Sequence, residues 1–443
     1  MYYYKLLMEK FIAPYLCKRS EYIGVELEYP LIFLDSKINT KQIILNLFKY
    51  LQENYGFEND KLDIDQNPIS IKNNLGDKIT LEGRYEIIEF AMQKDLSLSN
   101  IADKFFYYFE IVQNFLKKYD CFLTGMGTNL VDSCSKIHLL NSDFCKAIHS
   151  YIYKYTSYKN PNYFLTNMQS IQTHLEIPIN RDEKTEGENL LKALNLFSKL
   201  DFARGTLFSN SLPNKTAIPS NISYPEDILC ARDFNWAHSG FPDTGSVDAE
   251  FKSTTELIEY ISKLKLYFKK TENSYESFKG PSIAEYFSDP SQKDDVLCVF
   301  RYLHNVVLNS YATLEIRSDC TQPLKDAFAP VAFNLGISRK INEATELTRR
   351  FFQDNNITYS NSTLRNMAIN DIKITDDNTM RKFLQSLYNL AYDALKERGL
   401  SEEKHMRCLQ GRIDKLECPA KYTKRQLEKG TSLYEIIEQC SEI

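Results

Sequence analysis

The stretch that most constrains the fold is YIGVELEYPLIF, residues 22–33, in which apolar side chains alternate with Glu26 and Glu28. A period of two predicts a β-strand, and alternate side chains on a strand share a face, so the two carboxylates lie together. Carboxylates held side by side repel each other, and a hard cation such as Mg²⁺, which prefers oxygen ligands, would relieve that repulsion. A single Glu-x-Glu pair is more often a solvated sheet face, so the pattern carries weight only if other strands repeat it.

Three later segments repeat the pattern. Polar side chains occupy alternate positions in Glu82/Arg84/Glu86, in Gln172/His174/Glu176 and in Glu315/Arg317/Asp319. Glu89 follows the first set and shares its face only if a bulge intervenes. Together these strands predict a sheet with one face lined by Glu, His and Arg, which would suit several divalent ions and a polyphosphate.

Composition excludes several classes of protein. The net charge is −5, from 54 Lys and Arg against 59 Asp and Glu, which argues against nucleic acid or an anionic membrane as a partner. The chain has no apolar run long enough for a membrane span, and the charges within its first residues lead us to expect no signal peptide there. Its ten cysteines form no C-x-x-C motif, so we expect reduced thiols in a cytoplasmic protein. No P-loop motif occurs, so any ATP must bind by other means.

No linker or repeat divides the sequence, so we expect one α+β catalytic domain over residues 1–443. Residues 20–330 would form the sheet region that bears the motifs, and residues 330–443 a mostly helical part. Further expectations are a helix with Thr40 as N-cap that ends at Gly56, a helix opened by a capping box at 185–188, a turn at 205–213, a loop at 230–245 and a polar tail after about residue 416.

Seven segments follow one another in the order of a known family's motifs. They are IGVELEYP, ITLEGRYEIIEFAM followed by SL, LTGMGTN, SIQTHLEI, LFSNSLP, ARDFNWAHSGFPDTG and TLEIRSDCTQP. On these segments the sequence resembles the glutamate–cysteine ligase (γ-glutamylcysteine synthetase) family, especially its plant/proteobacterial and carboxylate–amine ligase branches. The resemblance covers roughly residues 20–330, and each motif is weak except in combination with the others.

The resemblance implies a glutamine-synthetase-like fold, a curved antiparallel β-sheet funnel flanked by helices, that binds ATP with Mg²⁺ or Mn²⁺. The positions that match metal ligands are Glu26, Glu28, Glu82, Glu89, His174 and Glu315, with Glu86 as the substitute if the bulge is misplaced. Arg317 matches the arginine that meets the transferred phosphoryl group, and with Glu315 it forms the catalytic pair. Gln172, Ser209, Asn210 and Ser211 match nucleotide-binding positions, and Arg232 and Trp236 match the substrate loop.

The sequence departs from the family pattern at two places. Asp243 replaces an arginine expected to handle an anion, and an arginine upstream of the last metal strand is missing from HNVVLN, residues 304–309. The leading hypothesis is a ligase that joins the γ-carboxyl of glutamate to the amine of cysteine through γ-glutamyl phosphate. Three alternatives stay open: another amine acceptor, a binding protein of this fold without turnover, and a guanidino-kinase-type phosphotransferase. The sequence does not predict an oligomeric state.

Overall fold

The structure is a computed structural model of the chain. It describes residues 2–16, 21–33, 38–131, 138–156, 167–177, 187–214, 223–239, 241, 243–272, 274–289, 291–292, 300 and 303–442.

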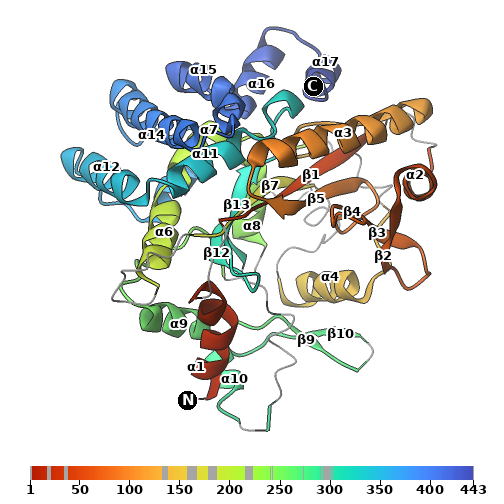
Figure 1. Cartoon of the computed structure of the whole chain (residues 1–443), viewed down its shortest axis with the longest axis horizontal. Coiled ribbons are helices and arrows are strands. Elements are labelled where there is room, and N and C mark those ends of the chain that lie inside the picture. Colours follow the sequence, from red (N-terminus) through yellow and green to blue (C-terminus); the bar gives the residue numbers. More distant parts are fainter. Residues whose placement is uncertain are drawn as a thin grey trace.

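An antiparallel sheet forms the centre of the molecule (Figure 1). Its strands are β1 (Ile23–Phe33), β2 (Phe57–Leu62), β3 (Pro68–Asn73), β4 (Lys78–Leu81), β5 (Ile87–Asp95), β6 (Cys121–Leu123), β7 (Ser170–Leu175), β12 (Val306–Leu308) and β13 (Leu314–Cys320). Among the described residues these nine strands run in the order β12-β13-β7-β1-β5-β4-β3-β2, and β6 pairs with the end of β1. Two small sheets pair β9 (Phe268–Lys270) with β10 (Tyr275–Ser277), and β8 (Thr244–Gly245) with β11 (Leu303–His304).

Helices surround this sheet. The first part of the chain supplies α1 (Tyr2–Leu7), η1 (Met8–Ile12), η2 (Ala13–Leu16), α2 (Thr40–Tyr55), α3 (Leu98–Leu116), η3 (Lys117–Tyr119), α4 (Asp143–Tyr155), α6 (Glu188–Lys199), α7 (Asp201–Phe208), α8 (Ala231–His238), α9 (Thr254–Lys263) and α10 (Ile283–Tyr286). The C-terminal part supplies η6 (Leu324–Asp326), α11 (Ala329–Ser338), α12 (Ile341–Asp354), α13 (Asn361–Ile369), α14 (Asp377–Arg398), η7 (Glu402–Met406), α15 (Arg407–Lys415), α16 (Pro419–Glu428) and α17 (Leu433–Gln439). Each described helix is too short or too polar to cross a lipid bilayer. The predicted α+β class, with an antiparallel sheet and a helical C-terminal part, is confirmed.

The two faces of the sheet meet different neighbours. Tyr29 of β1 and Phe90 of β5 pack against Phe105 and Phe109 of α3, with ring centroids 5.1–5.8 Å apart. Figure 1 shows α3 and α11 on this side of the central strands and α4 on the other side. Because alternate residues of a strand face opposite ways, the face toward α3 is the apolar one, and the other face carries the glutamates of β1.

One prediction about the first half of the chain needs correction. Helix α2 is capped by Asn39, which accepts a hydrogen bond from the Gln42 N–H at 3.1 Å, and not by Thr40. The hydroxyl of Thr40 instead donates to the buried carboxylate of Glu86. The helix does end at Gly56, whose φ of +68° is the left-handed conformation that glycine adopts without strain.

The region between α6 and β8 is more helical than predicted. Residues 205–208 belong to α7 rather than to a turn. Gly205 allows α13 to approach this helix closely, since Arg365 and Ala368 lie 3.0–3.3 Å from where a Cβ at position 205 would stand. The predicted loop at 230–245 begins with α8, so the prediction of a loop was wrong for residues 231–238. The capping box falls partly on residues 185–186, outside the described residues, and α6 begins after Gly187.

The predicted polar tail is also helical. Ile436 and Ile437 of α17 are fully buried beside Ile32 and Met126, and the Cys440 carbonyl accepts the Gly125 N–H at 3.0 Å. These contacts join the end of the chain to the far end of β1. The prediction failed because the apolar residues of α17 are few, and their burial depends on partners more than 300 positions away.

Candidate active site

The register of the sheet gathers acidic side chains on the face that α3 does not cover. Glu28 of β1 lies directly opposite Glu89 of β5, and Glu26 is two residues before Glu28 on the same face. Glu82 follows β4, where its N–H donates to the Ile87 carbonyl at 3.2 Å, and its carboxylate is close enough to Glu89 to raise the pKa of that residue. We call Glu26, Glu28, Glu82 and Glu89 the acidic group.

Two members of the acidic group resist ionisation in the folded chain. Burial raises the pKa of Glu28 to about 7, with a further contribution from the charge of Glu82. Burial also raises the pKa of Glu89 well above its ordinary value, and the charges of Glu82 and Glu26 add to that rise. These carboxyl groups ionise with difficulty by themselves and would ionise readily beside an added cation.

The carboxylate of Glu28 is held in one orientation. The Ser170 N–H donates to its Oε2 at 2.8 Å, and the Ser170 hydroxyl donates to its Oε1 at 3.2 Å. The Gln172 amide also donates to Oε1, at 2.9 Å. The structure therefore assigns Gln172, predicted as a nucleotide-binding residue, a contact with the acidic group.

His174 extends the polar face to the next strand. Its Nε2 lies 3.3 Å from Glu26 Oε1, and its backbone lies opposite Gly24 on β1 and Glu315 on β13. A Cβ at position 24 would stand 3.2 Å from His174 Cβ, so the absence of a side chain at Gly24 leaves the space that His174 occupies. Burial alone would lower the pKa of His174, but the charges of Glu26 and Glu315 outweigh it and raise that pKa.

Glu315 and Arg317 form an ion pair beside His174. The Asn309 amide donates to Glu315 Oε2 at 3.0 Å and also lies 3.1 Å from His174 Nδ1. Burial alone would raise the pKa of Glu315, but Arg317 and His174 hold it at about 2. Glu315 is therefore an anion, and its charge raises the pKa of Arg317 against the effect of burial. The Arg317 side chain is 27% exposed, so part of it is open to a ligand.

The donor set fits a hard divalent cation that is shared with a substrate. Within the described ranges, no three His, Cys, Asp or Glu side chains already surround one point as a complete metal site would. Mg²⁺ is commonly held by only one or two carboxylates together with substrate phosphates and water, and so needs no complete protein cage. Carboxylates with raised pKa values on one face meet that requirement, and metal binding by these residues stays a prediction.

Glu86 does not join the acidic group. Its Oε2 lies 3.0 Å from Arg84 Nε, its Oε1 lies 2.8 Å from His138 Nδ1, and Thr40 donates to the same oxygen. Burial would raise the pKa of Glu86, but His138 and Arg84 lower it. The protein's own groups neutralise this carboxylate, so the structure places Glu89, and not the substitute Glu86, among the candidate ligands.

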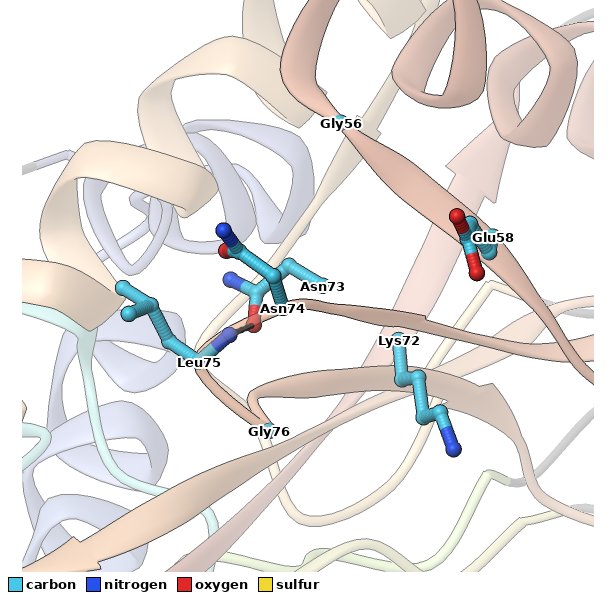
Figure 2. Close-up of a pocket in the computed structure, with 7 residues that line it drawn as sticks. All are labelled: Gly56, Glu58, Lys72, Asn73, Asn74, Leu75 and Gly76. Atoms are coloured by element: carbon cyan, nitrogen blue, oxygen red, sulfur yellow. Dashed lines mark hydrogen bonds between the residues drawn. The ribbon is translucent and has the colours of Figure 1, made fainter.

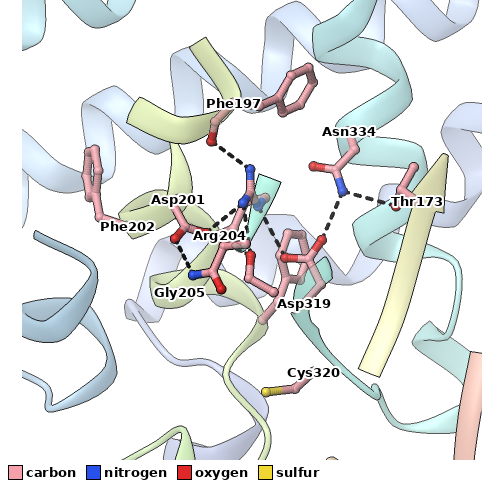
Figure 3. A network of polar contacts seen from close by, with 12 residues as sticks. Thr173, Phe197, Asp201, Phe202, Arg204, Gly205, Asp319, Cys320 and Asn334 are labelled. Atoms are coloured by element: carbon pink, nitrogen blue, oxygen red, sulfur yellow. Dashed lines mark hydrogen bonds and ion pairs between the residues drawn. The ribbon is translucent and has the colours of Figure 1, made fainter. Parts of the chain in front are cut away.

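Asp319 also lies elsewhere than its spacing predicted. A bulge in β13 between Ile316 and Asp319 reverses the alternation, so Asp319 pairs with Ile171 on the opposite face from Glu315. There it accepts a hydrogen bond from Asn334 at 2.9 Å and lies 3.4 Å from Arg204, within a buried network that also contains Asp201 (Figure 3).

Arg232 lies beside the acidic group. It is in the first turn of α8, its N–H donates to the Ser211 hydroxyl at 3.1 Å, and its charge lowers the pKa of Glu28 against the larger effect of burial. Trp236, on the same helix, packs 6.2 Å from Phe241 in an aromatic cluster. The structure therefore brings Arg232 toward the glutamates and gives Trp236 a packing role.

The predicted turn of Ser209, Asn210 and Ser211 is buried and bound to the protein itself. The Ser209 hydroxyl donates to the Gly205 carbonyl, and the Asn210 amide donates to the carbonyls of Gly125 and Thr321. These bonds hold the segment after α7 near the end of β13. A direct nucleotide contact of this turn stays a prediction.

Asp243 has protein partners of its own. Its Oδ2 accepts hydrogen bonds from the Lys265 N–H at 2.7 Å and from the Tyr267 hydroxyl at 2.8 Å. The carboxylate thus ties residues 243–245 to the segment before β9. A local structural role accounts for the acidic residue at this position.

A separate pocket of about 360 Å³ lies at the far edge of the sheet, against the β2–β3 hairpin (Figure 2). It is lined by Gly56, Glu58, Lys72, Asn73, Asn74, Leu75 and Gly76. None of the predicted site residues lines it, so pocket shape alone would have pointed away from the acidic group.

Sequence reasoning missed several residues that position the site. Ser170 orients Glu28, and Asn309 with Thr313 contacts His174 from the turn between β12 and β13. Ser170 is two residues before Gln172, so the period of two could have found it. Asn309 comes beside Glu315 only when the hairpin closes, and its own sequence carries no signal of that contact.

No protein-family model matches the sequence, and the curated proteins compared with it gave no match. Solved structures do match. A bifunctional glutathione synthetase from Pasteurella multocida aligns with 99% of this chain and 54% of its own, at 12% identity and a TM-score of 0.55. A glutamate–cysteine ligase from Francisella tularensis in complex with AMP aligns with 96% of this chain and 88% of its own, at 13% identity and a TM-score of 0.52.

The chain has the fold of a glutamate–cysteine ligase. The resemblance read from the ordered motifs pointed to this fold. The chain spans about half the length of the bifunctional Pasteurella protein and most of the length of the Francisella enzyme.

Proposed function

We propose that the protein is an ATP-dependent carboxylate–amine ligase that joins the γ-carboxyl of glutamate to the amine of cysteine. The observation that carries the proposal is the acidic group, with His174 and Glu315, on the face of the sheet that α3 does not cover, in a chain with this fold. A cluster of carboxylates with raised pKa values is costly to a folded protein, and such groups concentrate at functional sites. The Francisella structure contains AMP, which supports a nucleotide as one substrate.

The reaction needs activation of a carboxylate. Direct attack by an amine fails because oxide is a poor leaving group. Transfer of the γ-phosphoryl group of ATP to the carboxylate oxygen gives an acyl phosphate and ADP. The amine then attacks the acyl carbon, phosphate leaves with the bonding electron pair, and the nitrogen loses a proton to form the amide.

The chain's residues have distinct roles in this scheme. Bound Mg²⁺ or Mn²⁺, held by the acidic group with His174 and Glu315, would neutralise charge on the phosphates. Arg317, kept cationic and oriented by Glu315, would stabilise the charge of the transferring phosphoryl group. Arg232 would bind an oxyanion of a substrate beside Glu28. No covalent nucleophile is required.

The test is a substrate panel. Purified protein is incubated with ATP, Mg²⁺, glutamate and one of several amines, with phosphate release measured and products weighed by mass spectrometry. We expect phosphate release that depends on both glutamate and cysteine, with γ-glutamylcysteine as product. Release with a different amine would reassign the acceptor, and a phosphorylated product without an amide would indicate a phosphotransferase. If no pair of substrates gives phosphate release, the protein is not a ligase of this kind.

A further inference from the structure

One carboxylate near the site is shared by two arginines from distant parts of the chain. Asp233 Oδ1 accepts a hydrogen bond from Arg232 Nη1 at 3.3 Å, and Asp233 Oδ2 accepts one from Arg365 Nε at 2.6 Å. All three side chains are almost fully buried. Arg365 belongs to α13, in the helical C-terminal part whose role the sequence left open.

Arg365 is fixed by further contacts. Its Nη1 donates to the Asp201 carbonyl at 2.8 Å, and its Nη2 donates to the Ser318 carbonyl at 3.0 Å. Gly205 of α7 allows this approach, since a Cβ there would stand 3.0 Å from Nη1. The guanidinium thus spans α7, β13 and α8, and its planar fork of donors suits such multiple bonding.

A second carboxylate compensates Arg365, and this leaves Asp233 free to act on Arg232. Arg365 Nη1 also lies 3.5 Å from Asp201 Oδ1, so the charge of Arg365 is divided between Asp201 and Asp233. The bond from Arg365 Nε to Oδ2 fixes the orientation of the Asp233 carboxylate, and the other oxygen of that carboxylate then holds the Arg232 guanidinium.

We propose that Arg365 is a positioning residue for Arg232, acting through Asp233, and that α13 thereby contributes to substrate binding. The proposal rests on the proposed function in one respect, that Arg232 binds a carboxylate or phosphate of a substrate. It goes beyond that function by bringing the C-terminal helices into the site.

The test compares three variants of the full chain. Asp233→Asn keeps the shape but presents an amide to one arginine, and Arg365→Lys keeps the charge but loses the fork. The matched control is Arg412→Lys, because Arg412 is also a buried arginine of the C-terminal part that binds a backbone carbonyl, at Leu207, and a carboxylate, at Asp326, without touching Asp233. Binding of MgADP and of L-glutamate is measured separately by calorimetry, with melting temperatures and, where turnover occurs, kcat and KM.

We expect Asp233→Asn and Arg365→Lys each to lower the affinity for one of the two ligands by about tenfold. Arg412→Lys should lower neither affinity by more than about twofold. If only the affinity for MgADP falls, Arg232 binds a phosphate group. If only the affinity for glutamate falls, Arg232 binds a carboxylate. In turnover assays the KM for the weakened ligand should rise by the same factor, with a smaller change in kcat.

Wild-type affinity in folded Asp233→Asn and Arg365→Lys would overturn the proposal, as would an equal loss in Arg412→Lys. If Arg365→Lys does not fold, the outcome with Asp233→Asn decides. A wild-type protein that binds ligand but shows no turnover would contradict the ligase while leaving this test intact, and one that binds neither ligand would contradict the role of Arg232.

Discussion

Glu28 and Glu89 lie directly opposite each other on β1 and β5, and the pKa of each is raised, first by burial and then by the charge of Glu82. Directly opposed like charges destabilise a sheet. The fold therefore keeps, near its centre, a cluster of carboxylates that works against its own stability.

This relationship predicts a pH-dependent stability. The ordinary pKa of a glutamate is 4.5, and that of Glu28 in the folded chain is about 7. Between these values the folded chain holds a proton that the unfolded chain has released, so the free energy of unfolding falls as pH rises through this window. The penalty from Glu28 at pH 8 is at most about 3 kcal/mol.

The measurement is the melting temperature from pH 4.5 to 8 in EDTA. We expect the melting temperature of Glu28→Gln to exceed that of the wild type by a margin that grows as pH increases. At pH 8, excess MgCl₂ should raise the melting temperature of the wild type more than that of the variant. Parallel curves for the two proteins would show that Glu28 titrates normally in the folded chain.

Glu26→Gln and Glu86→Gln should have opposite effects. Glu26 is 33% exposed and contacts His174, so its loss should abolish turnover, by about a hundredfold or more, with little change in stability. Glu86 is fully buried against Arg84, and breaking that pair should cost ~3 kcal/mol or more. Phosphate release and denaturant unfolding on both variants check this contrast. Wild-type turnover in Glu26→Gln would remove Glu26 from the site.

Gly24→Ala should disturb His174 without disturbing the strand. The added methyl would stand 3.2 Å from His174 Cβ, and the position has no positive φ, so the backbone tolerates alanine. We expect turnover to fall about tenfold or more, with a stability change under about 1 kcal/mol. Gly411→Ala in α15 is the control, because nothing lies within 4 Å of its Cβ and alanine favours a helix. Equal activity in the two variants would mean that His174 adjusts freely.

The local alternation in the sequence was sufficient to predict much of the site. The period of two correctly placed Glu26 with Glu28, and the same rule found the strands that carry His174 and Glu315. Each of these predictions needs only the geometry of one strand, and the order of the segments then supplied the fold.

What the sequence did not decide, or placed wrongly, depends on contacts between strands or between distant segments. Whether Glu89 or Glu86 joins the acidic group depends on the path of the turn at Gly83, where φ is +70°. The bulge that turns Asp319 away from Glu315 is defined only by its pairing with β7. The contact of Arg365 with Asp233 joins residues 132 positions apart, and no local pattern marks it.

Asp243 can have a local structural role or can contact the acceptor amine, and substitutions distinguish the two. If its role is local, Asp243→Asn should keep one oxygen for the Lys265 N–H and the Tyr267 hydroxyl and lower stability by only ~1 kcal/mol. Tyr267→Phe, which removes one of those donors, should cost a similar amount. Neither substitution should change the order in which amines are accepted. A new acceptor preference in Asp243→Asn, with Tyr267→Phe unchanged, would instead show that the carboxylate contacts the acceptor, as the charge reversal at this position first suggested.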